Sequence, residues 1–413
     1  MHILFLTDNF PPETNAPASR TFEHCREWVL AGHQVTVITC VPNFPYGKVF
    51  DGYRNRLWQQ EQMDGIRVIR VWSYITANEG FVRRILDYQS FMLSAILATP
   101  FVRGAVLVVG TSPQFFTACA AYVVSRLKRI PFVFELRDMW PESIKAVGAM
   151  KGDTLVYRWL ERIEMLLYRK ASRIVTVTNT FKAMLISRGI DGTKIHVVTN
   201  GVDLSHFAPQ AKDPELIQKL ALQGMFVAGY IGTHGMAHAL ETLLEAAAIL
   251  QQTPGAENVR LVFLGDGSRK LHIVARSEAM GLHNVLFLES VAKDLVARYW
   301  SVLDVSIIHL RKAELFTTVI PSKLFECMGM GIPVLHGVAG ESADIVVREQ
   351  VGELFESENA QQLVAGLLHM RDHSDAYARY QQNGLVAARR YDRKHLALLM
   401  LQVFDTLTAP KRL

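Results

Sequence analysis

The feature that most constrains the fold is the regular alternation of short apolar runs with longer segments of helical period. Runs such as HILFLT (2–7) and AVLVVG (105–110) are almost wholly apolar, whereas LETLLEAAAILQQ (240–252) places apolar residues three or four apart. A strand that is apolar on both faces must be covered on both faces, which is typical of parallel sheets flanked by helices. The sequence therefore predicts an α/β protein with parallel sheets.

The apolar runs fall into two sets. Seven precede residue 200, at 2–7, 34–40, 66–72, 105–110, 131–136, 173–178 and 194–200. Five follow it, at 225–232, 259–265, 284–290, 304–310 and 332–337. The segment 200–215 is rich in Asn, Gly, Pro and Asp and has no period, so it is the expected linker. We expect two Rossmann-like domains that bind ligands beyond the carboxyl ends of their strands.

Charge and cysteine content exclude several classes of protein. Half of the 413 residues are hydrophobic and a fifth are charged, which excludes a disordered chain. The net charge of +5 is small for a nucleic-acid-binding protein, so no nucleic-acid partner is expected. This charge is uneven, at +7 through residue 205 and −2 beyond it, and the first half is expected to face an anionic partner. Four scattered cysteines without a CxxC pair are typical of a reduced, cytoplasmic protein.

Two apolar segments bear on a possible membrane association. Residues 104–125 carry no charge, but the polar residues 111–114 interrupt them, so we expect a strand, a loop and a buried helix there. In the segment 81–104, Arg83, Arg84 and Arg103 flank an apolar stretch that is too short to span a bilayer. This segment is either a helix lying at an anionic membrane surface or a helix packed in the core.

The segment FTTVIPSKLFECMGMGIPVL (316–335) has the residue types of an anion site. Pro321 suits the first turn of a helix, and Lys323 and Glu326 lie three apart on one face of it. A lysine at this end of a helix is disfavoured unless an anion is held there by the lysine and by the backbone amides of residues 318–322. Glu326 is placed to accept hydrogen bonds from a vicinal diol such as a ribose. The alternative is an ordinary surface ion pair between Lys323 and Glu326.

This segment resembles the carboxyl-terminal signature of the retaining GT-B glycosyltransferases of family 4. Its PSKLFE form resembles a group of bacterial O-antigen and capsule enzymes that transfer N-acetyl-L-fucosamine. The family carries E-x7-E at this place. Glu326 matches the second glutamate, whereas Thr318 stands at the first. Other segments resemble the family in the same order: FLTDNFPPETNAPASR (5–20), NGVDLSHF (200–207), GYIGTHGMAHALETLLEAA (229–247), FLGDGS (263–268) and GESADIV (340–346).

The resemblance implies a GT-B fold, with two facing Rossmann-like domains, parallel sheets and a central cleft. The first domain would span residues 1–203 and bind the acceptor. A final helix, 392–413, would cross back to it. The second domain, 204–391, would bind a nucleotide-sugar.

The resemblance also implies roles for particular residues. Lys323 would neutralise the departing diphosphate, Glu326 would bind the ribose, and Asp138 would stabilise charge on the sugar or orient the acceptor hydroxyl. These three are the expected catalytic residues, although Asp138 alternatively caps a helix from Pro141. Further donor contacts are expected from Asn15, Ala16, Gly232, Thr233, His234, Thr318, Val319 and Ser322. Arg20 and Arg137 are expected on the acceptor side. No cofactor or metal is expected.

The implied activity is metal-independent, retaining transfer of a sugar from a UDP-sugar to a polyprenyl-diphosphate-linked saccharide in bacterial surface-polysaccharide synthesis. The sugar would be N-acetyl-L-fucosamine or a related deoxyaminosugar. The enzyme would be cytoplasmic and peripheral at the inner membrane, which its basic first domain would contact. Two alternatives stay open. One is a UDP-sugar 2-epimerase of the same fold, which needs acidic and His groups that the sequence does not show. The other is a nucleotide-sugar-binding protein without catalysis, suggested by Thr318.

Overall fold

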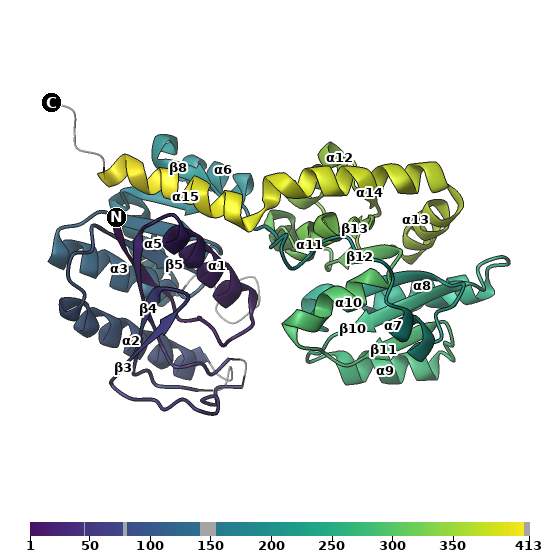
Figure 1. Ribbon diagram of the computed structural model, residues 1–413, viewed down its shortest axis with the longest axis horizontal. Coiled ribbons are helices and arrows are strands. Elements are labelled where there is room, and N and C mark those ends of the chain that lie inside the picture. The colour runs from purple at the N-terminus through teal and green to yellow at the C-terminus, as the bar shows by residue number, and fades with distance from the viewer. Residues whose placement is uncertain (45, 77–80, 141–153, 409–413) are drawn as a thin grey trace. The chain divides into compact units, whose positions relative to one another are not determined.

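The computed structural model describes residues 1–44, 46–76, 81–140 and 154–408, and the chain forms two compact units. Unit 1 comprises Met1–Thr199 and Arg393–Leu413, and unit 2 comprises Asn200–Asp392 (Figure 1). Each unit is a Rossmann-like domain in which helices cover both faces of a sheet that is parallel apart from one edge strand of unit 1. The sequence prediction of an α/β protein with two such domains is confirmed.

Unit 1 is built on an eight-stranded sheet in the order β3-β4-β2-β1-β5-β6-β7-β8. Seven of its strands match the seven predicted apolar runs. The eighth, β3, has the polar sequence WQQEQM and lies at the edge of the sheet, where it pairs antiparallel with β4. The strands are β1 (His2–Leu6), β2 (Gln34–Thr39), β3 (Trp58–Met63), β4 (Ile66–Val71), β5 (Leu107–Thr111), β6 (Phe132–Leu136), β7 (Arg173–Thr176) and β8 (Ile195–Val197).

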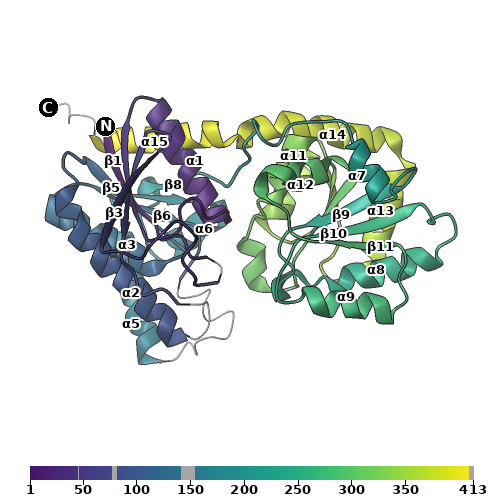
Figure 2. The same cartoon turned by 60° about the horizontal axis from the view of Figure 1, so that its bottom comes forward.

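Two layers of helices sandwich this sheet (Figure 2). Alternate residues of β1 show the arrangement, because Ile3 and Phe5 pack with α1 and α15, whereas Leu4 and Leu6 pack with α2, α3 and α5. The helical segments described in this unit are α1 (Ala16–Leu30), α2 (Phe81–Ala98), η1 (Thr99–Phe101), α3 (Phe115–Lys128), α5 (Leu155–Lys170), α6 (Asn179–Ser187), η2 (Gly192–Lys194) and α15 (Arg393–Thr408).

The last helix, α15, packs on unit 1 alongside α1 (Figure 1). The fully buried Trp28 of α1 donates a hydrogen bond from Nε1 to the Ala397 carbonyl oxygen (2.8 Å), and its ring lies 5.2 Å from that of Phe404. Arg393, at the start of α15, forms an ion pair with Glu23 of α1. Residues 409–413 of the expected helix lie outside the described residues.

The segment 81–104 was predicted either to lie at a membrane surface or to pack in the core, and the structure shows a core-packed helix. Phe91 and Ala95 of α2 are buried against the sheet, which makes α2 a core-packed helix. Its opposite face exposes Leu93 (57%) and Leu97 (73%). In the segment 104–125 the structure shows β5, a loop and α3, as expected. Among the described residues, no helix is both long and apolar enough to cross a membrane.

Unit 2 contains a six-stranded parallel sheet in the order β11-β10-β9-β12-β13-β14. Five strands match the predicted runs, and the short β14 is added at the edge. The strands are β9 (Phe226–Ile231), β10 (Val259–Leu264), β11 (Val285–Leu288), β12 (Val305–His309), β13 (Val334–Gly337) and β14 (Gly352–Leu354). The α-helices are α7 (Pro214–Lys219), α8 (Glu241–Gln252), α9 (Lys270–Ala279), α10 (Val296–Ser301), α11 (Lys323–Met330), α12 (Glu341–Glu349), α13 (Ala360–Asp372) and α14 (Ser374–Ala388). The 3-10 segments are η3 (Met236–His238), η4 (Lys293–Leu295), η5 (Glu314–Thr318) and η6 (Arg389–Tyr391).

Candidate functional site

The amino end of α11 in unit 2 has the character of an anion site. Lys323 is the first residue of this helix and follows the cap residue Ser322. Its ammonium makes no hydrogen bond or ion pair with any residue that the structure describes. Burial lowers the pKa of Lys323 to about 8, although Glu326, one turn further on, opposes this shift. A partly buried cation without a counter-ion, placed at a helix amino terminus, is suited to bind an anion.

An aromatic ring holds the Lys323 ammonium in place. Nζ lies 3.7 Å from the centroid of the Tyr230 ring, a cation–π contact. The Tyr230 hydroxyl in turn donates a hydrogen bond to the carbonyl oxygen of the exposed Thr233 (2.8 Å). Gly232 lies between them at φ +143°, and a Cβ there would lie 2.9 Å from Nζ. The sequence carries no signal for Tyr230, because only the fold brings it to Lys323.

Backbone hydrogen bonds join the loop after β9 to the loop after β10. The His234 amide donates to the Asp266 carbonyl (2.9 Å), and the Arg269 amide donates to the His234 carbonyl (2.9 Å). The His234 ring is fully buried. Burial, with the nearby lysine charges, lowers its pKa to about 4, so the ring is neutral. The His234 side chain thus lies inside the unit, and its contact with the donor stays a prediction.

The residues before α11 form the 3-10 turn η5. Within it the Thr318 hydroxyl donates to a backbone carbonyl three residues earlier (2.8 Å), and the Val319 amide donates to the Phe316 carbonyl (3.3 Å). The expectation of free amides throughout 318–322 is therefore corrected at Val319, because the turn uses that amide.

In unit 1, Asn15 and Ala16 lie at the amino end of α1. Asn15 caps the helix, since its Oδ1 accepts a hydrogen bond from the Ala18 amide (2.9 Å). Its Nδ2 donates to Oδ1 of Asn9 (2.6 Å). Ala16 is exposed in the first turn. This end of α1 follows the carboxyl end of β1, as expected for a Rossmann-like unit.

Arg20 is a buried residue of the same helix, only 2% exposed. Its guanidinium donates to Oε1 of Glu135 (3.2 Å) and to the carbonyl oxygens of Thr199 (2.7 Å) and Val198 (3.0 Å). All three guanidinium nitrogens are therefore engaged within the unit. The expectation that Arg20 contacts an acceptor is corrected, because the side chain ties α1 to the ends of β6 and β8.

Arg137 and Asp138 follow β6 and are half-buried. The Ser112 hydroxyl accepts hydrogen bonds from the amides of Arg137 (2.7 Å) and Asp138 (3.1 Å). The Arg137 guanidinium reaches the Pro17 carbonyl (3.4 Å), and burial lowers its pKa to about 10. Both residues thus lie at the sheet edge where α1 begins. The helix that Asp138 alternatively caps would begin at Pro141, which lies outside the described residues.

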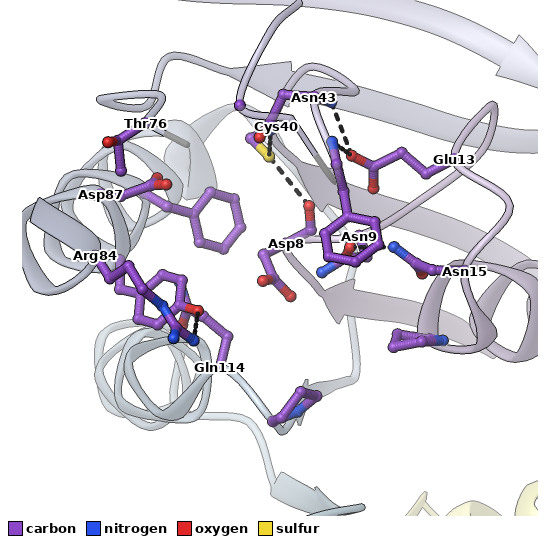
Figure 3. A pocket seen from close by; sticks show the side chains of 16 residues that line it. Asp8, Asn9, Glu13, Asn15, Cys40, Asn43, Thr76, Arg84, Asp87 and Gln114 are labelled. Atoms are coloured by element: carbon purple, nitrogen blue, oxygen red, sulfur yellow. Dashed lines mark hydrogen bonds between the residues drawn. The ribbon is translucent and has the colours of Figure 1, made fainter. Parts of the chain in front are cut away.

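A pocket of about 230 Å³ is present at this edge of unit 1 (Figure 3). Of the residues that line it, only Asn15 is among the predicted site residues. Its wall combines carboxylates, amides and aromatic rings, with one arginine: Asp8, Glu13, Asp87, Asn9, Asn15, Asn43, Gln114, Phe44, Tyr88, Phe91 and Arg84. No three His, Cys, Asp or Glu side chains within the described residues are grouped so as to hold a metal ion.

The carboxyl groups of the pocket hold their protons more tightly than free ones. Burial, together with the charge of Asp8, raises the pKa of Asp87 to about 7, while Arg84 opposes the shift. Burial also raises the pKa of Asp8 and of Glu13. Since the buried Glu13 and the half-buried Asp8 and Asp87 share one pocket, ionising all three carboxyl groups is costly.

Two family models match the chain. One, described as a glycosyl transferase 4-like domain, matches residues 15–201, and the other, described as glycosyl transferases group 1, matches residues 225–373. Both matched domains are glycosyltransferase domains, so the chain is a glycosyltransferase of the group 1 and 4-like type. Over 342 residues it is 24% identical to the putative colanic acid biosynthesis glycosyl transferase WcaI of Escherichia coli K12, covering 80% of this chain and 82% of that protein.

Solved structures share the fold. Sucrose-phosphate synthase of Thermosynechococcus elongatus superposes with a TM-score of 0.76 at 15% identity, covering 99% of both chains. Anabaena HepE in complex with UDP-glucose superposes with a TM-score of 0.70 at 17% identity, covering 98% of this chain and all of that one. The two Rossmann-like units are therefore those of the GT-B glycosyltransferase fold.

The raised pKa of Asp87 predicts a pH-dependent effect on stability. In the unfolded chain this carboxyl ionises near its ordinary pKa of about 4, whereas in the folded chain it retains its proton until about pH 7. The free energy of unfolding therefore falls as pH rises through this window. We expect Asp87→Asn to raise the thermal unfolding midpoint at pH 8 and to leave it nearly unchanged at pH 4. Asp51→Asn, at an exposed position, is the control, and an equal shift at both pH values contradicts the prediction.

Proposed function

We propose that the protein transfers a sugar, with retention, from a UDP-sugar to a lipid-diphosphate-linked saccharide during bacterial surface-polysaccharide assembly. The observation that carries the proposal is the Lys323 ammonium, held against Tyr230 beside Gly232 with no counter-ion among the described residues. The name of WcaI, which refers to colanic acid biosynthesis, and the UDP-glucose bound by HepE support the substrate classes.

The site at Lys323 would stabilise the negative charge of the leaving group. Breaking the bond between the sugar and UDP develops negative charge on the diphosphate, and a preorganised cation stabilises that charge. Lys323 would supply it in place of a metal ion, with the amide end of α11 adding its dipole. Glu326, one turn along the same helix, would accept hydrogen bonds from the ribose. Asp138 would orient the acceptor hydroxyl.

The donor sugar is proposed from the PSKLFE segment (321–326), which resembles that of N-acetyl-L-fucosamine transferases. A transfer assay tests the function with the purified full chain, a lipid-diphosphate-linked disaccharide and a panel of UDP-sugars that includes UDP-N-acetyl-L-fucosamine. We expect UDP release that depends on the acceptor. Conversion of the donor without acceptor would indicate an epimerase, and UDP binding without either product would indicate a non-catalytic binding protein. Both of these outcomes overturn the proposal.

We predict that removal of the Lys323 charge weakens UDP binding and slows sugar transfer together. We expect Lys323→Ala to lower UDP affinity and to reduce the transfer rate about 10²- to 10³-fold, as loss of one transition-state donor does. In the unmodified protein, UDP affinity should fall as pH rises above 8, because Lys323 then loses its proton. The variant should lack that dependence. Lys312→Ala, an exposed lysine of the same unit, is the control, and unchanged UDP binding in Lys323→Ala refutes the diphosphate role.

We propose further that unit 1 contacts the anionic inner-membrane surface through α2 and α5. These helices lie on the same side of the sheet of unit 1. Their outer faces expose large apolar side chains, including Leu97 (73%), Leu155 (83%) and Trp159 (57%). Exposed arginines such as Arg83 and Arg158 accompany them. A basic surface with apolar side chains is suited to anionic headgroups.

Vesicle flotation tests this membrane contact. We expect the protein to float with phosphatidylcholine vesicles that contain phosphatidylglycerol, and less as the salt concentration rises. The double variant Leu93→Ser/Leu97→Ser should lose binding because it removes apolar area from α2. Leu271→Ser, which alters an 86% exposed leucine of unit 2, should bind as the unmodified protein does. Equal flotation of all three proteins contradicts the contact.

A further inference from the structure

Two exposed histidines lie four residues apart in unit 2, where α13 ends and α14 begins (Figure 1). His369 is in the last turn of α13, and His373 is the residue between the two helices. Their rings are stacked, with centroids 4.1 Å apart and planes inclined by 30°. The transfer chemistry proposed above uses neither side chain, so this pair of imidazoles needs its own explanation.

Hydrogen bonds set which nitrogen of each ring carries the proton. His369 Nδ1 lies 2.6 Å from Oε1 of Glu353 in β14, and His373 Nδ1 lies 2.9 Å from the His369 carbonyl oxygen. A carbonyl or an ionised carboxylate only accepts hydrogen bonds, so each Nδ1 is the donor. Nε2 of each neutral ring then carries a free lone pair. No residue in the described part of the chain forms a hydrogen bond with either Nε2.

This arrangement is that of histidines prepared to bind a metal ion. Metal-binding histidines commonly donate their second ring N–H to a carboxylate or a backbone carbonyl, as His369 and His373 both do. Zn²⁺ binds imidazole nitrogen at about 2.0–2.1 Å, so two nitrogens on one ion lie at most about 4 Å apart. The 4.1 Å spacing of the ring centroids is compatible with such a pair.

The electrostatic surroundings favour a cation at the two rings. The carboxyl end of α13, a helix of 13 residues, carries the negative end of the helix dipole. Glu353 adds a carboxylate, and the Tyr380 hydroxyl of α14 donates to its Oε1 (3.4 Å). The positive charge of the neighbouring Arg371 is paired with Asp372 (2.7 Å).

The pair lies at the opposite end of the unit 2 sheet from Lys323. Arg371, between the two histidines in the sequence, donates to the Gly255 carbonyl oxygen (2.6 Å) and to Asn258 Oδ1 (3.2 Å), just before β10 begins. Lys323 lies beside Gly232, just after β9 ends. Since β9 and β10 are parallel, the histidines are at the amino ends of the strands and Lys323 is at the carboxyl ends.

We propose that His369 and His373 bind one divalent transition-metal ion through their Nε2 atoms, with Glu353 orienting His369 and water completing the coordination. The ion joins the last turn of α13 to the start of α14. It is structural and takes no part in sugar transfer, so this inference does not rest on the proposed function. Imidazole ligands favour Cu²⁺, Ni²⁺ and Zn²⁺, whereas Mg²⁺ and Ca²⁺ prefer oxygen ligands. Two protein ligands are also consistent with the absence of any metal-binding group of three among the described residues.

Calorimetric titration of the full chain, purified without a histidine tag, tests the site. We expect Ni²⁺ or Zn²⁺ to bind and to raise the thermal unfolding midpoint, since an ion that binds only the folded chain stabilises it. His369→Ala and His373→Ala should each lose this ion and the rise in midpoint. Glu353→Gln should weaken Ni²⁺ binding about 10- to 100-fold, as loss of an outer-shell partner does. Mg²⁺ should neither bind nor raise the midpoint.

His283→Ala is the matched control, because His283 is an exposed residue of the same unit with no second histidine within four residues. It should bind Ni²⁺ as the unmodified protein does. Thermal unfolding without metal shows whether each variant is folded, and if His369→Ala is not, His373→Ala carries the test.

Electron paramagnetic resonance of bound Cu²⁺ counts the nitrogen ligands directly. We expect two in the unmodified protein and at most one in His369→Ala or His373→Ala. The proposal is overturned if the folded histidine variants bind Ni²⁺ as the control does, if Mg²⁺ raises the midpoint equally, or if bound Cu²⁺ has fewer than two nitrogen ligands.

Discussion

Burial of both faces of a parallel sheet is the constraint on which the rest of the structure depends. A strand covered on both faces by helices has little room for charged side chains, so the polar residues gather where the strands end. Asp8 follows β1, Arg137 and Asp138 follow β6, and Thr233 follows β9. The candidate sites of both units are consequences of this arrangement.

The two units place ionisable side chains in contrasting surroundings. In unit 2, the ammonium of Lys323 is kept against an aromatic ring instead of a carboxylate, so its charge is not cancelled within the described part of the chain. In unit 1, burial raises the pKa values of Asp8, Glu13 and Asp87 at one pocket. The first setting favours an anion, whereas in the second the ionisation of all three carboxyl groups is costly. The setting of Lys323 is the one that the proposed diphosphate of the donor requires.

Much of the fold follows from local patterns. The apolar runs predict seven of the eight strands in unit 1 and five of the six in unit 2, because burial on both faces leaves a continuous apolar signal. The exception in unit 1, β3, is an exposed edge strand with alternating partial burial, so its sequence WQQEQM carries little of that signal. The helix that begins at Lys323 was also predictable, since Pro321 and the residues after it are local helix signals.

Less of the candidate sites than of the fold could be predicted from the sequence. The sequence by itself determined the two-domain α/β class and the place of Lys323 at the start of a helix, because periodicity and helix-end chemistry act over a few neighbouring residues. Only the tertiary structure decided that Tyr230 holds the Lys323 ammonium and that the Arg20 guanidinium binds Glu135 and two carbonyl oxygens. It also decided that the charge of Asp8 raises the pKa of Asp87. These interactions are between residues that are distant in the chain. The burial that sets their charge state exists only once the helices have packed on the sheets.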